Sequence, residues 1–278
     1  MFKEGKTFIS RLLIGIVLLA IALITIIPGG DITYVLTLII SLRGLFELLR
    51  VFKVEKTIVG ICAYIFSLLY FGSLRFGDYL PYHWPDLFRL IVIVYIIVLF
   101  IILVFAYPRY RLGQLVAVFA GFFYAVVMIS FIYQIRMLPL GAYIIWLLFI
   151  CSWGSDTAAY CVGMSIGKNR LAPKISPKKS IEGAIGGVLG TILLGTLYGL
   201  ALNHWTDIDV SVLVFAAVGG VGSIVSQVGD LAASALKRHY DIKDFGSIMP
   251  GHGGVLDRFD SMIFVAPLIY YVSVAFLL

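Results

Sequence analysis

The chain has 278 residues, of which 61% are hydrophobic and only 13% are charged, and its mean hydropathy is +1.04. Soluble domains carry about 45–50% apolar and about 25% charged residues, so this composition excludes an ordinary soluble globular protein. The 21 Lys and Arg outnumber the 15 Asp and Glu, which gives a formal net charge of +6. We therefore expect a basic protein that lies in a lipid bilayer.

Continuous apolar stretches follow one another along most of the chain. A helix needs about 20 apolar residues to cross the hydrocarbon layer, and there are nine candidate stretches: residues 8–27, 32–50, 57–74, 87–106, 113–134, 138–164, 182–202, 210–235 and 262–278. Outer-membrane barrels instead show short strands of alternating polarity. The pattern predicts an all-α polytopic membrane protein with about nine transmembrane helices. The first stretch resembles a signal peptide but lacks a small-residue cleavage pattern, so we expect it to be retained.

The Lys and Arg residues are distributed unevenly between the loops that join these stretches. With the N-terminus in the cytoplasm, 18 of the 21 fall on the cytoplasmic side, and only Arg75, Arg89 and Arg136 fall on the other. Cytoplasmic loops normally hold the excess of Lys and Arg, and a wrong helix count would scramble this asymmetry. We expect a cytoplasmic N-terminus and an extracytoplasmic C-terminus.

The two halves of the chain differ in composition. Residues 1–137, with the first five stretches, are rich in Leu, Ile, Val and Phe, have short loops and show no acidic residue in mid-span, as is typical of a scaffold. In residues 138–278, Gly, Ser and charged residues enter the helices, and the cytoplasmic loops 165–181 and 236–261 are long and polar. We expect this second region to be catalytic, with its chemistry on the cytoplasmic side.

The stretch 138–164 has one side made of small or polar residues, including Ser152, Ser155 and Asp156. This side is suited to pack against a polar face of a later helix and to leave a cleft open to the cytoplasm. Asp156 is one of two acids clearly inside a predicted span. A role in hydrogen bonding between helices is nearly as well supported for it as a catalytic one.

The stretch 182–202 contains Gly183, Gly186, Gly187 and Gly190, which form two overlapping GxxxG spacings. Such spacings let a second helix backbone approach closely. We favour packing against a neighbouring helix of the same chain. A homodimer formed through this Gly-rich helix is the alternative.

The loop before this helix is rich in cations: Lys168, Arg170, Lys174, Lys178 and Lys179. Ser180 is suited to cap the helix, and Glu182 lies in its first turn, where the helix dipole favours an anion. Capping does not explain the five cations, which beside a helix N-terminus resemble an anion-binding arrangement. The alternative is an ordinary positive-inside signal with lipid headgroup contacts.

The stretch 210–235 has a continuous polar stripe. At 100° per residue the following residues project within about 60° of one direction: Ser223, Ser226, Gln227, Asp230, Ser234, Lys237, Arg238 and Asp241. An ionisable group within a span is costly and usually lines a functional cavity. Asp230 is therefore a candidate functional acid, with a buried structural partner for a basic residue as the alternative.

The loop 236–261 combines a glycine-rich turn with cations and carboxylates. Pro250, Gly251, Gly253 and Gly254 permit a tight turn that exposes backbone amides, an arrangement that suits phosphate oxygens. Asp257 and Asp260 are three residues apart and share one face if helical. Hard oxygen ligands beside cations suit a magnesium nucleotide, although Asp260 also fits an N-cap of the last helix. His252 lies between glycines in an exposed turn, where no hydrophobic core is available to pack its ring.

These residues resemble the signature of a known family, the phosphatidate cytidylyltransferases, also called CDP-diacylglycerol synthases. The matching positions lie within 27 contiguous residues: Ser234, Lys237, Arg238, Lys243, Asp244, Pro250, His252, Gly253, Gly254, Asp257, Arg258 and Asp260. A second segment, residues 176–180 followed by Glu182 and Gly183, is similar to another conserved part of the family. The resemblance implies condensation of CTP with phosphatidate to give CDP-diacylglycerol and pyrophosphate, with Mg²⁺.

On this interpretation Asp230 and Asp257 are the metal ligands, and a second cation is an open alternative. The residues assigned to catalysis are Asp230, Asp257, Lys237, Arg238, Asp156 and His252. The residues assigned to substrate binding are Lys178, Lys179, Ser180, Glu182, Ser234, Lys243, Gly253, Gly254, Arg258 and Asp260. The implied partners are CTP, phosphatidate and membrane lipid, without nucleic acid. The implied location is a prokaryotic-type cytoplasmic membrane, with the active site facing the cytoplasm.

Two other functions fit parts of the sequence. A related enzyme would use CTP with another acceptor, such as an isoprenoid phosphate or a polyprenol. An ion-coupled transporter would use the intramembrane acids to move protons or sodium, but it leaves the loop 236–261 unexplained. Solute flux without nucleotide would distinguish the transporter from both enzymes.

Overall fold

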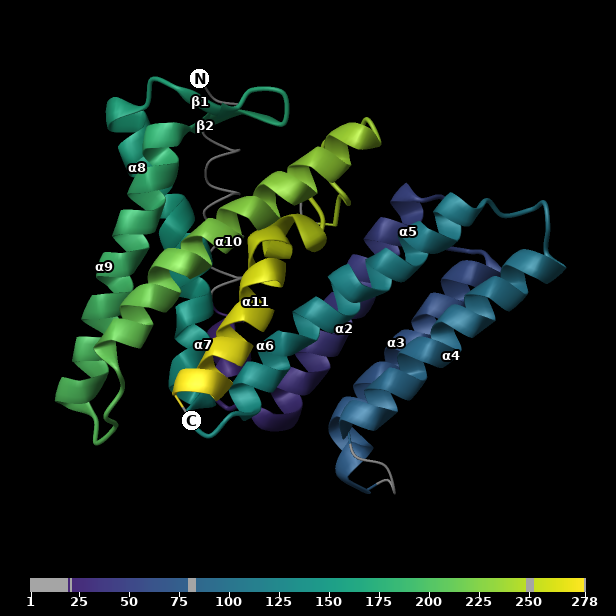
Figure 1. The fold of residues 1–278 in the computed structure, drawn as a ribbon, viewed down its shortest axis with the longest axis horizontal. Coiled ribbons are helices and arrows are strands. Elements are labelled where there is room, and N and C mark those ends of the chain that lie inside the picture. The colour runs from purple at the N-terminus through teal and green to yellow at the C-terminus, as the bar shows by residue number, and fades with distance from the viewer. Residues whose placement is uncertain (1–19, 21, 80–83, 249–252, 278) are drawn as a thin grey trace.

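The computed structural model describes residues 20, 22–79, 84–248 and 253–277. Within these residues, eight helical segments are long and apolar enough to cross a membrane (Figure 1). They are α2 (Gly30–Val51), α3 (Ile58–Phe76), α4 (Trp84–Phe105), α5–η2–α6 (Leu112–Met137), α7–η3–α8 (Gly141–Ile166), α9 (Ile181–Trp205), α10 (Val212–His239) and α11 (Leu256–Phe276). The prediction of a helical polytopic membrane protein is confirmed.

Eight of the nine predicted stretches correspond to these segments. The first, at residues 8–27, lies largely outside the described residues, so the count of nine stays a prediction. A short 3₁₀ turn, η1 (Gly77–Tyr79), follows α3. Two long segments are each interrupted by a π-helical turn: η2 (Phe123–Val127) separates α5 (Leu112–Phe122) from α6 (Met128–Met137), and η3 (Ile150–Gly154) separates α7 (Gly141–Phe149) from α8 (Ser155–Ile166). Such turns inside helices are frequent at functional sites.

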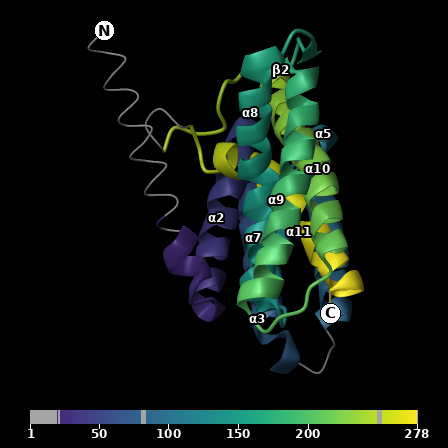
Figure 2. The same ribbon diagram turned by 90° about the vertical axis from the view of Figure 1, so that its left-hand side faces the viewer.

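The helices run roughly between two ends of the molecule. The turns near residues 52–57 and 106–111, the segment between α8 and α9, and the C-terminus of α10 lie toward the upper end in Figure 1, and the C-terminus of the chain lies at the lower end, as it does in Figure 2. Helices α2, α6, α7 and α11 pack in the middle of the bundle, and α4 lies at its edge against α3 and α5. The basic loops predicted for one face therefore gather at one end.

The segment between α8 and α9, predicted as a plain loop at 165–181, contains a small β-hairpin. Strand β1 (Arg170–Ala172) pairs antiparallel with β2 (Ser176–Ser180), and a register irregularity lies between Arg170 and Ala172. The strands are short and polar, so hydropathy alone gave no sign of them. The hairpin holds the cationic segment in one arrangement at the end of the bundle.

The last helix begins earlier than predicted. Helix α11 starts at Leu256 rather than near 262, and α10 extends to His239, so the loop predicted at 236–261 is shorter. Asp260 therefore lies inside α11, and its interpretation as an N-cap is wrong. The reason is that polar residues in the first turns of α11 have protein partners, which a hydropathy pattern does not show. Asp257 and Asp260 are both helical.

The glycines of α9 pack against α8. A Cβ atom added at Gly186 would lie 2.5 Å from the Cβ of Val162, and one added at Gly190 would lie 2.6 Å from that of Ala158. Larger side chains would push the two helices apart. The Gly-rich face is thus covered within the chain, which favours the internal-packing interpretation over a homodimer through this helix.

Candidate active site

The base of the hairpin is organised by the first residues of α9. The Ser180 hydroxyl accepts a hydrogen bond from the Gly183 backbone N–H at 3.2 Å, which is the predicted helix cap. The Glu182 carboxylate accepts hydrogen bonds from the backbone N–H groups of Lys168 and Asn169 and from the Asn169 side chain, the last at 2.7 Å. Ser180 and Glu182 therefore fix the hairpin to the start of α9.

An ion pair joins this hairpin to the polar stripe of α10. The Lys179 ammonium group contacts the Asp230 carboxylate, and each side chain is 26% exposed. Lys179 belongs to β2 and Asp230 to α10, two elements that are far apart in the chain. Their contact brings a predicted phosphate-binding cation and a predicted metal ligand into one place.

A second ion pair joins α10 to α11. The Lys237 ammonium group donates to Oδ1 of Asp257 at 2.8 Å, and the Asp257 side chain is only 2% exposed. The other oxygen, Oδ2, accepts from the backbone N–H groups of Phe245 at 2.8 Å and of Gly254 at 2.9 Å. Asp257 thus anchors the loop that leads into α11. Gly253 in this loop has φ +82°, a conformation that favours glycine.

The N-terminal part of the stripe faces α8 and α9. Ser223 and Ser155 share a hydrogen bond of 2.7 Å between their hydroxyls. The Gln227 side chain donates to the Ala184 carbonyl at 3.1 Å and to the Ser223 hydroxyl at 3.2 Å. The polar side of the stretch 138–164 therefore meets the stripe, as expected from the two patterns.

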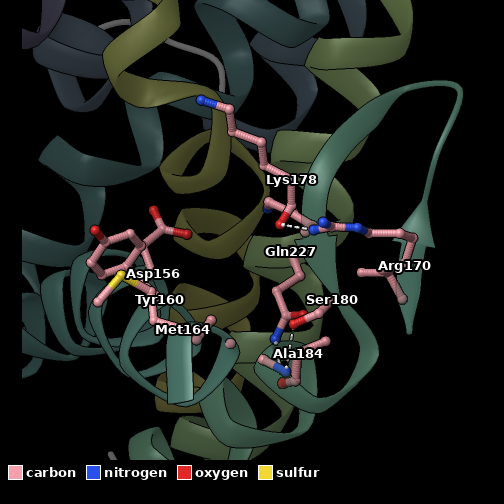
Figure 3. Close-up of a pocket in the computed structure, with 13 residues that line it drawn as sticks. Asp156, Tyr160, Met164, Arg170, Lys178, Ser180, Ala184 and Gln227 are labelled. Carbon is pink, nitrogen blue, oxygen red and sulfur yellow. Dashed lines mark hydrogen bonds between the residues drawn. The ribbon is translucent and has the colours of Figure 1, made fainter. Parts of the chain in front are cut away.

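A cavity of about 420 Å³, called here the polar cavity, opens between α8, α9, α10 and the hairpin. Figure 3 shows Asp156 and Tyr160 from α8 on one side, Arg170 and Lys178 from the hairpin on the other, and Gln227 from α10 between them. Lys179 and Ser180 also line it. Its charged groups come from the elements expected to form the cytoplasmic cleft.

A smaller cavity of about 190 Å³, called here the apolar cavity, lies between α2, η3 and α11. Its lining is mostly hydrophobic, with Trp153, Phe259 and Met262 among the side chains, and Arg258 supplies its one positive charge within the described residues. Arg258 therefore gives this largely hydrophobic cavity a positively charged side chain.

Two further acids lie near the two ion pairs. Asp260 packs beside α10, where a Cβ atom added at Gly229, next to Asp230, would lie 2.9 Å from the Asp260 carbonyl oxygen, and Asp156 lines the polar cavity with Lys179. In the described part of the chain, however, no three Asp, Glu, His or Cys residues are arranged to hold a metal by themselves. Mg²⁺ usually takes only one or two protein carboxylates and completes its shell with phosphates and water. The residues present fit that mode of binding and not a cage made of protein alone.

Several predicted site residues lie apart from this group. The Arg238 guanidinium donates to the Ile242 carbonyl at 3.4 Å, near the end of α10. Lys243 is exposed and lines a separate groove with Arg50. Ser234, by contrast, is half-buried one helical turn after Asp230 on the same face of α10. His252, with Pro250 and Gly251, lies outside the described residues, so its predicted role is not addressed by the structure.

Sequence reasoning missed two side chains of the first half. Glu47 on α2 is 1% exposed and accepts hydrogen bonds from the start of α11. The Tyr124 hydroxyl, on η2, is buried without a hydrogen-bond partner among the described residues, and its ring packs edge-on against Phe264 of α11. An acid in an otherwise apolar stretch was the available signal for Glu47. Nothing in the pattern distinguished Tyr124 from the other aromatic residues.

Taken together, the bundle and its charged cleft define a polytopic membrane protein suited to bind phosphorylated anions at one end. Comparison with known proteins gives the family. Residues 9–276 match the cytidylyltransferase family, and the chain belongs to it.

Named relatives cover almost all of the chain. The phosphatidate cytidylyltransferase of Bacillus subtilis (strain 168) is 32% identical over 276 residues, 96% of this chain and 98% of the relative. Those of Staphylococcus aureus (strain COL) and Staphylococcus epidermidis (strain ATCC 12228) are 32% and 34% identical over 260 residues, 93% of this chain and 96% of each relative.

Proposed function

We propose that this chain is a membrane-embedded enzyme that condenses CTP with phosphatidate to give CDP-diacylglycerol and pyrophosphate in phospholipid biosynthesis. Family membership and the names of the relatives supply the reaction class. The structural observation that supports it most is the contact of Lys179 with Asp230 beside the polar cavity. This contact supports the proposal because a hairpin cation and a stripe acid lie together beside a cavity that would receive a triphosphate and its counter-ion.

The reaction needs little from the protein except position and charge. A phosphate oxygen of phosphatidate attacks the α-phosphorus of CTP, the bond to the oxygen that bridges to the β-phosphorus breaks, and pyrophosphate leaves. The attacking oxygen is already ionised, so no separate general base is required. Both reactants are anions, and such transfers depend mainly on orientation and charge neutralisation.

Lysines near the acids are suited to hold the phosphates. In the structure Lys179 and Lys237 each neutralise a carboxylate, and substrate phosphates would compete for the same ammonium groups. Lys178 is exposed at the polar cavity, where it would meet the CTP phosphates. The proposal also keeps the remaining predicted substrate-binding and catalytic residues: Asp156, Ser180, Glu182, Ser234, Arg238, Lys243, His252, Gly253, Gly254, Arg258 and Asp260.

Mg²⁺ would neutralise charge on the triphosphate, and Asp230 and Asp257 would hold it. Asp230 is the more accessible of the two, at 26% exposed against 2% for Asp257. Asp257 uses three of the four lone-pair sites that a carboxylate offers, so it has capacity for one further contact. A second cation is left open in this proposal.

The apolar cavity is suited to the lipid substrate. Its hydrophobic walls match an acyl chain, and Arg258 would meet the phosphate of phosphatidate. Because Arg258 follows Asp257, whose carboxylate holds Lys237 of the polar stripe, the lipid phosphate would lie near the charged end of α10. A water-soluble and a lipid substrate would then approach from different sides.

This chemistry requires that the cleft face the compartment that contains CTP. We propose an integral protein of the cytoplasmic membrane with nine spans, a cytoplasmic N-terminus, an extracytoplasmic C-terminus and the active site on the cytoplasmic face. Support comes from the excess of Lys and Arg in loops that gather at one end of the bundle. The bacterial origin of the relatives agrees with this location.

One assay tests the function directly. Purified protein in detergent would be given labelled CTP, Mg²⁺ and a panel of acceptors consisting of phosphatidate, an isoprenoid phosphate and a polyprenol, with pyrophosphate release as the readout. We expect pyrophosphate and labelled CDP-diacylglycerol with phosphatidate. Turnover only with an isoprenoid acceptor would contradict the substrate assignment. Solute flux in vesicles without any nucleotide turnover would favour a transporter.

A further inference from the structure

Glu47 is a buried acid in the half of the chain predicted to be only a scaffold. Its two oxygens accept hydrogen bonds from the start of α11: Oε1 from the Val255 N–H at 3.0 Å and Oε2 from the Leu256 N–H at 2.9 Å. The first N–H groups of a helix have no partner within that helix. Glu47 therefore caps a helix that begins more than 200 residues later in the chain.

The neighbouring loop is shaped around this carboxylate. A Cβ atom added at Gly246 would lie 2.5 Å from Oε1 of Glu47, and one added at Gly254 would come closer still to Oε2. Both glycines thus pack directly on the acid, one on each side of residues 249–252. Arg43 lies one turn before Glu47 on α2. Its Nε is 3.3 Å from Oε1 of Glu47, and its positive charge balances the charge of the carboxylate.

The capped turn also contains the acids and the arginine assigned to the reaction. Asp257 binds the same loop from the other side through the N–H groups of Phe245 and Gly254. Glu47 and Asp257 therefore hold one loop between α2 and α11. Moving either contact would rotate or shift the turn from which Arg258 and Asp260 project.

We propose that Glu47 is a positioning residue for cytidylyl transfer, because it fixes the start of α11 and with it the orientation of Asp257, Arg258 and Asp260. This inference rests on the function proposed above. It gives the first half of the chain a part in the active site. Glu47 contacts backbone groups and is assigned no contact with substrate.

The first test replaces Glu47 by Gln, which keeps the shape but turns one acceptor into a donor that faces a backbone N–H. We expect kcat to fall by up to about a hundredfold, because a displacement near 1 Å has effects of that size, with KM for CTP changed less than threefold. Amide hydrogen exchange should rise in residues 244–258 and stay unchanged elsewhere in the bundle. Glu55→Gln is the matched control, since Glu55 lies in the turn after α2 outside the proposed site.

The second test changes Gly246, which packs against the Glu47 carboxylate, in case Glu47→Gln fails to fold. Gly246→Ala should reduce kcat because the new methyl group would press on Oε1. Adding Glu47→Asp, which withdraws the carboxylate by about one C–C bond of roughly 1.5 Å, should restore activity above that of Gly246→Ala alone. Such non-additivity identifies a direct contact.

Each outcome decides the inference. The inference is supported by a rise in amide exchange confined to residues 244–258 together with a reduced kcat, or by rescue of activity in the double variant. Activity within twofold of wild type in Glu47→Gln, or a double variant no better than Gly246→Ala, overturns it; if exchange in Glu47→Gln rises throughout the bundle, the double variant decides. If the wild type itself transfers no cytidylyl group, the proposed function fails, whereas the exchange pattern still reports whether Glu47 holds the loop.

Discussion

The two lysine–carboxylate pairs differ in what each contributes. Lys237 and Asp257 are nearly buried, at 11% and 2% exposed, and Asp257 also holds two backbone N–H groups. Removing one partner of a buried pair leaves an uncompensated charge, which costs about 3–5 kcal/mol. Lys179 and Asp230 are more accessible and border the polar cavity through Lys179. Asp230 is therefore the acid whose loss should affect chemistry more than folding.

Asp230→Asn should reduce turnover by roughly a hundredfold or more, because it removes a charge proposed to stabilise the reacting phosphates. The thermal unfolding midpoint in detergent should change little, since each partner of this pair retains access to water. Turnover measured across a Mg²⁺ titration, together with the unfolding midpoint, checks both statements. Asp86→Asn is the control, because Asp86 forms an exposed pair with Arg89. Near-normal turnover of Asp230→Asn in Mg²⁺ would remove Asp230 from the metal site.

The hairpin cations should also differ from cations elsewhere on the same side. Lys179→Gln removes a charge-assisted contact worth roughly 1.5–3 kcal/mol, or about ten- to a hundredfold in kcat/KM. Lys53→Gln should change kcat/KM little, because Lys53 lies in the turn after α2, away from both cavities. Steady-state kinetics with CTP and phosphatidate provide the comparison. Equal small effects at both positions would show that these charges serve topology and lipid contact only.

At the scale of elements, the site depends on how closely α8 and α9 approach. The glycines of α9 let α8 come near enough for Asp156 and the hairpin to line one cavity. The π-helical turns η2 and η3 interrupt two spans, and Trp153 of η3 lines the apolar cavity. A shift between these helices would change the cavity without touching a charged residue.

Gly186→Ala should lower the stability of the protein and its activity together. The new methyl group would lie 2.5 Å from the Cβ of Val162, and overpacking of this kind typically costs about 1–3 kcal/mol. Thermal unfolding in detergent and the pyrophosphate assay give the two readouts. Gly72→Ala on α3 is the control, because nothing lies within 4 Å of a Cβ atom at that position. An unfolding midpoint unchanged in Gly186→Ala would contradict the close packing of α8 on α9.

At the scale of the whole molecule, charge and hydropathy act together. The apolar stretches set which residues cross the bilayer, and the basic loops collect at one end (Figure 1). The hairpin and the end of α10 therefore share that end. The water-soluble and the lipid substrate would meet at the boundary between the aqueous phase and the membrane.

A topology reporter fused to the C-terminus should be active only on the extracytoplasmic side. The reason is that 18 of the 21 Lys and Arg fall on one face only if the number of spans is odd and the N-terminus is cytoplasmic. A second fusion in the turn after α2, within residues 52–57, should report the cytoplasm. A cytoplasmic signal from the C-terminal fusion would contradict the proposed orientation, because the C-terminus lies at the end of the bundle opposite the basic loops.

The amino-acid sequence by itself determined the helical membrane class, the eight apolar stretches that appear as long helices among the described residues, and the segments that hold Lys179, Asp230 and Asp257. Hydrophobicity and helical periodicity are local properties, so they can be read along the chain. Only the tertiary structure decided which partners these side chains meet: Lys179 with Asp230, Lys237 with Asp257, and Glu47 with the first turn of α11. Those contacts join residues far apart in the chain. The first turns of α11 resemble a loop in the sequence because they are polar, and the distant partners that satisfy their polar groups cannot be recognised from a hydropathy pattern.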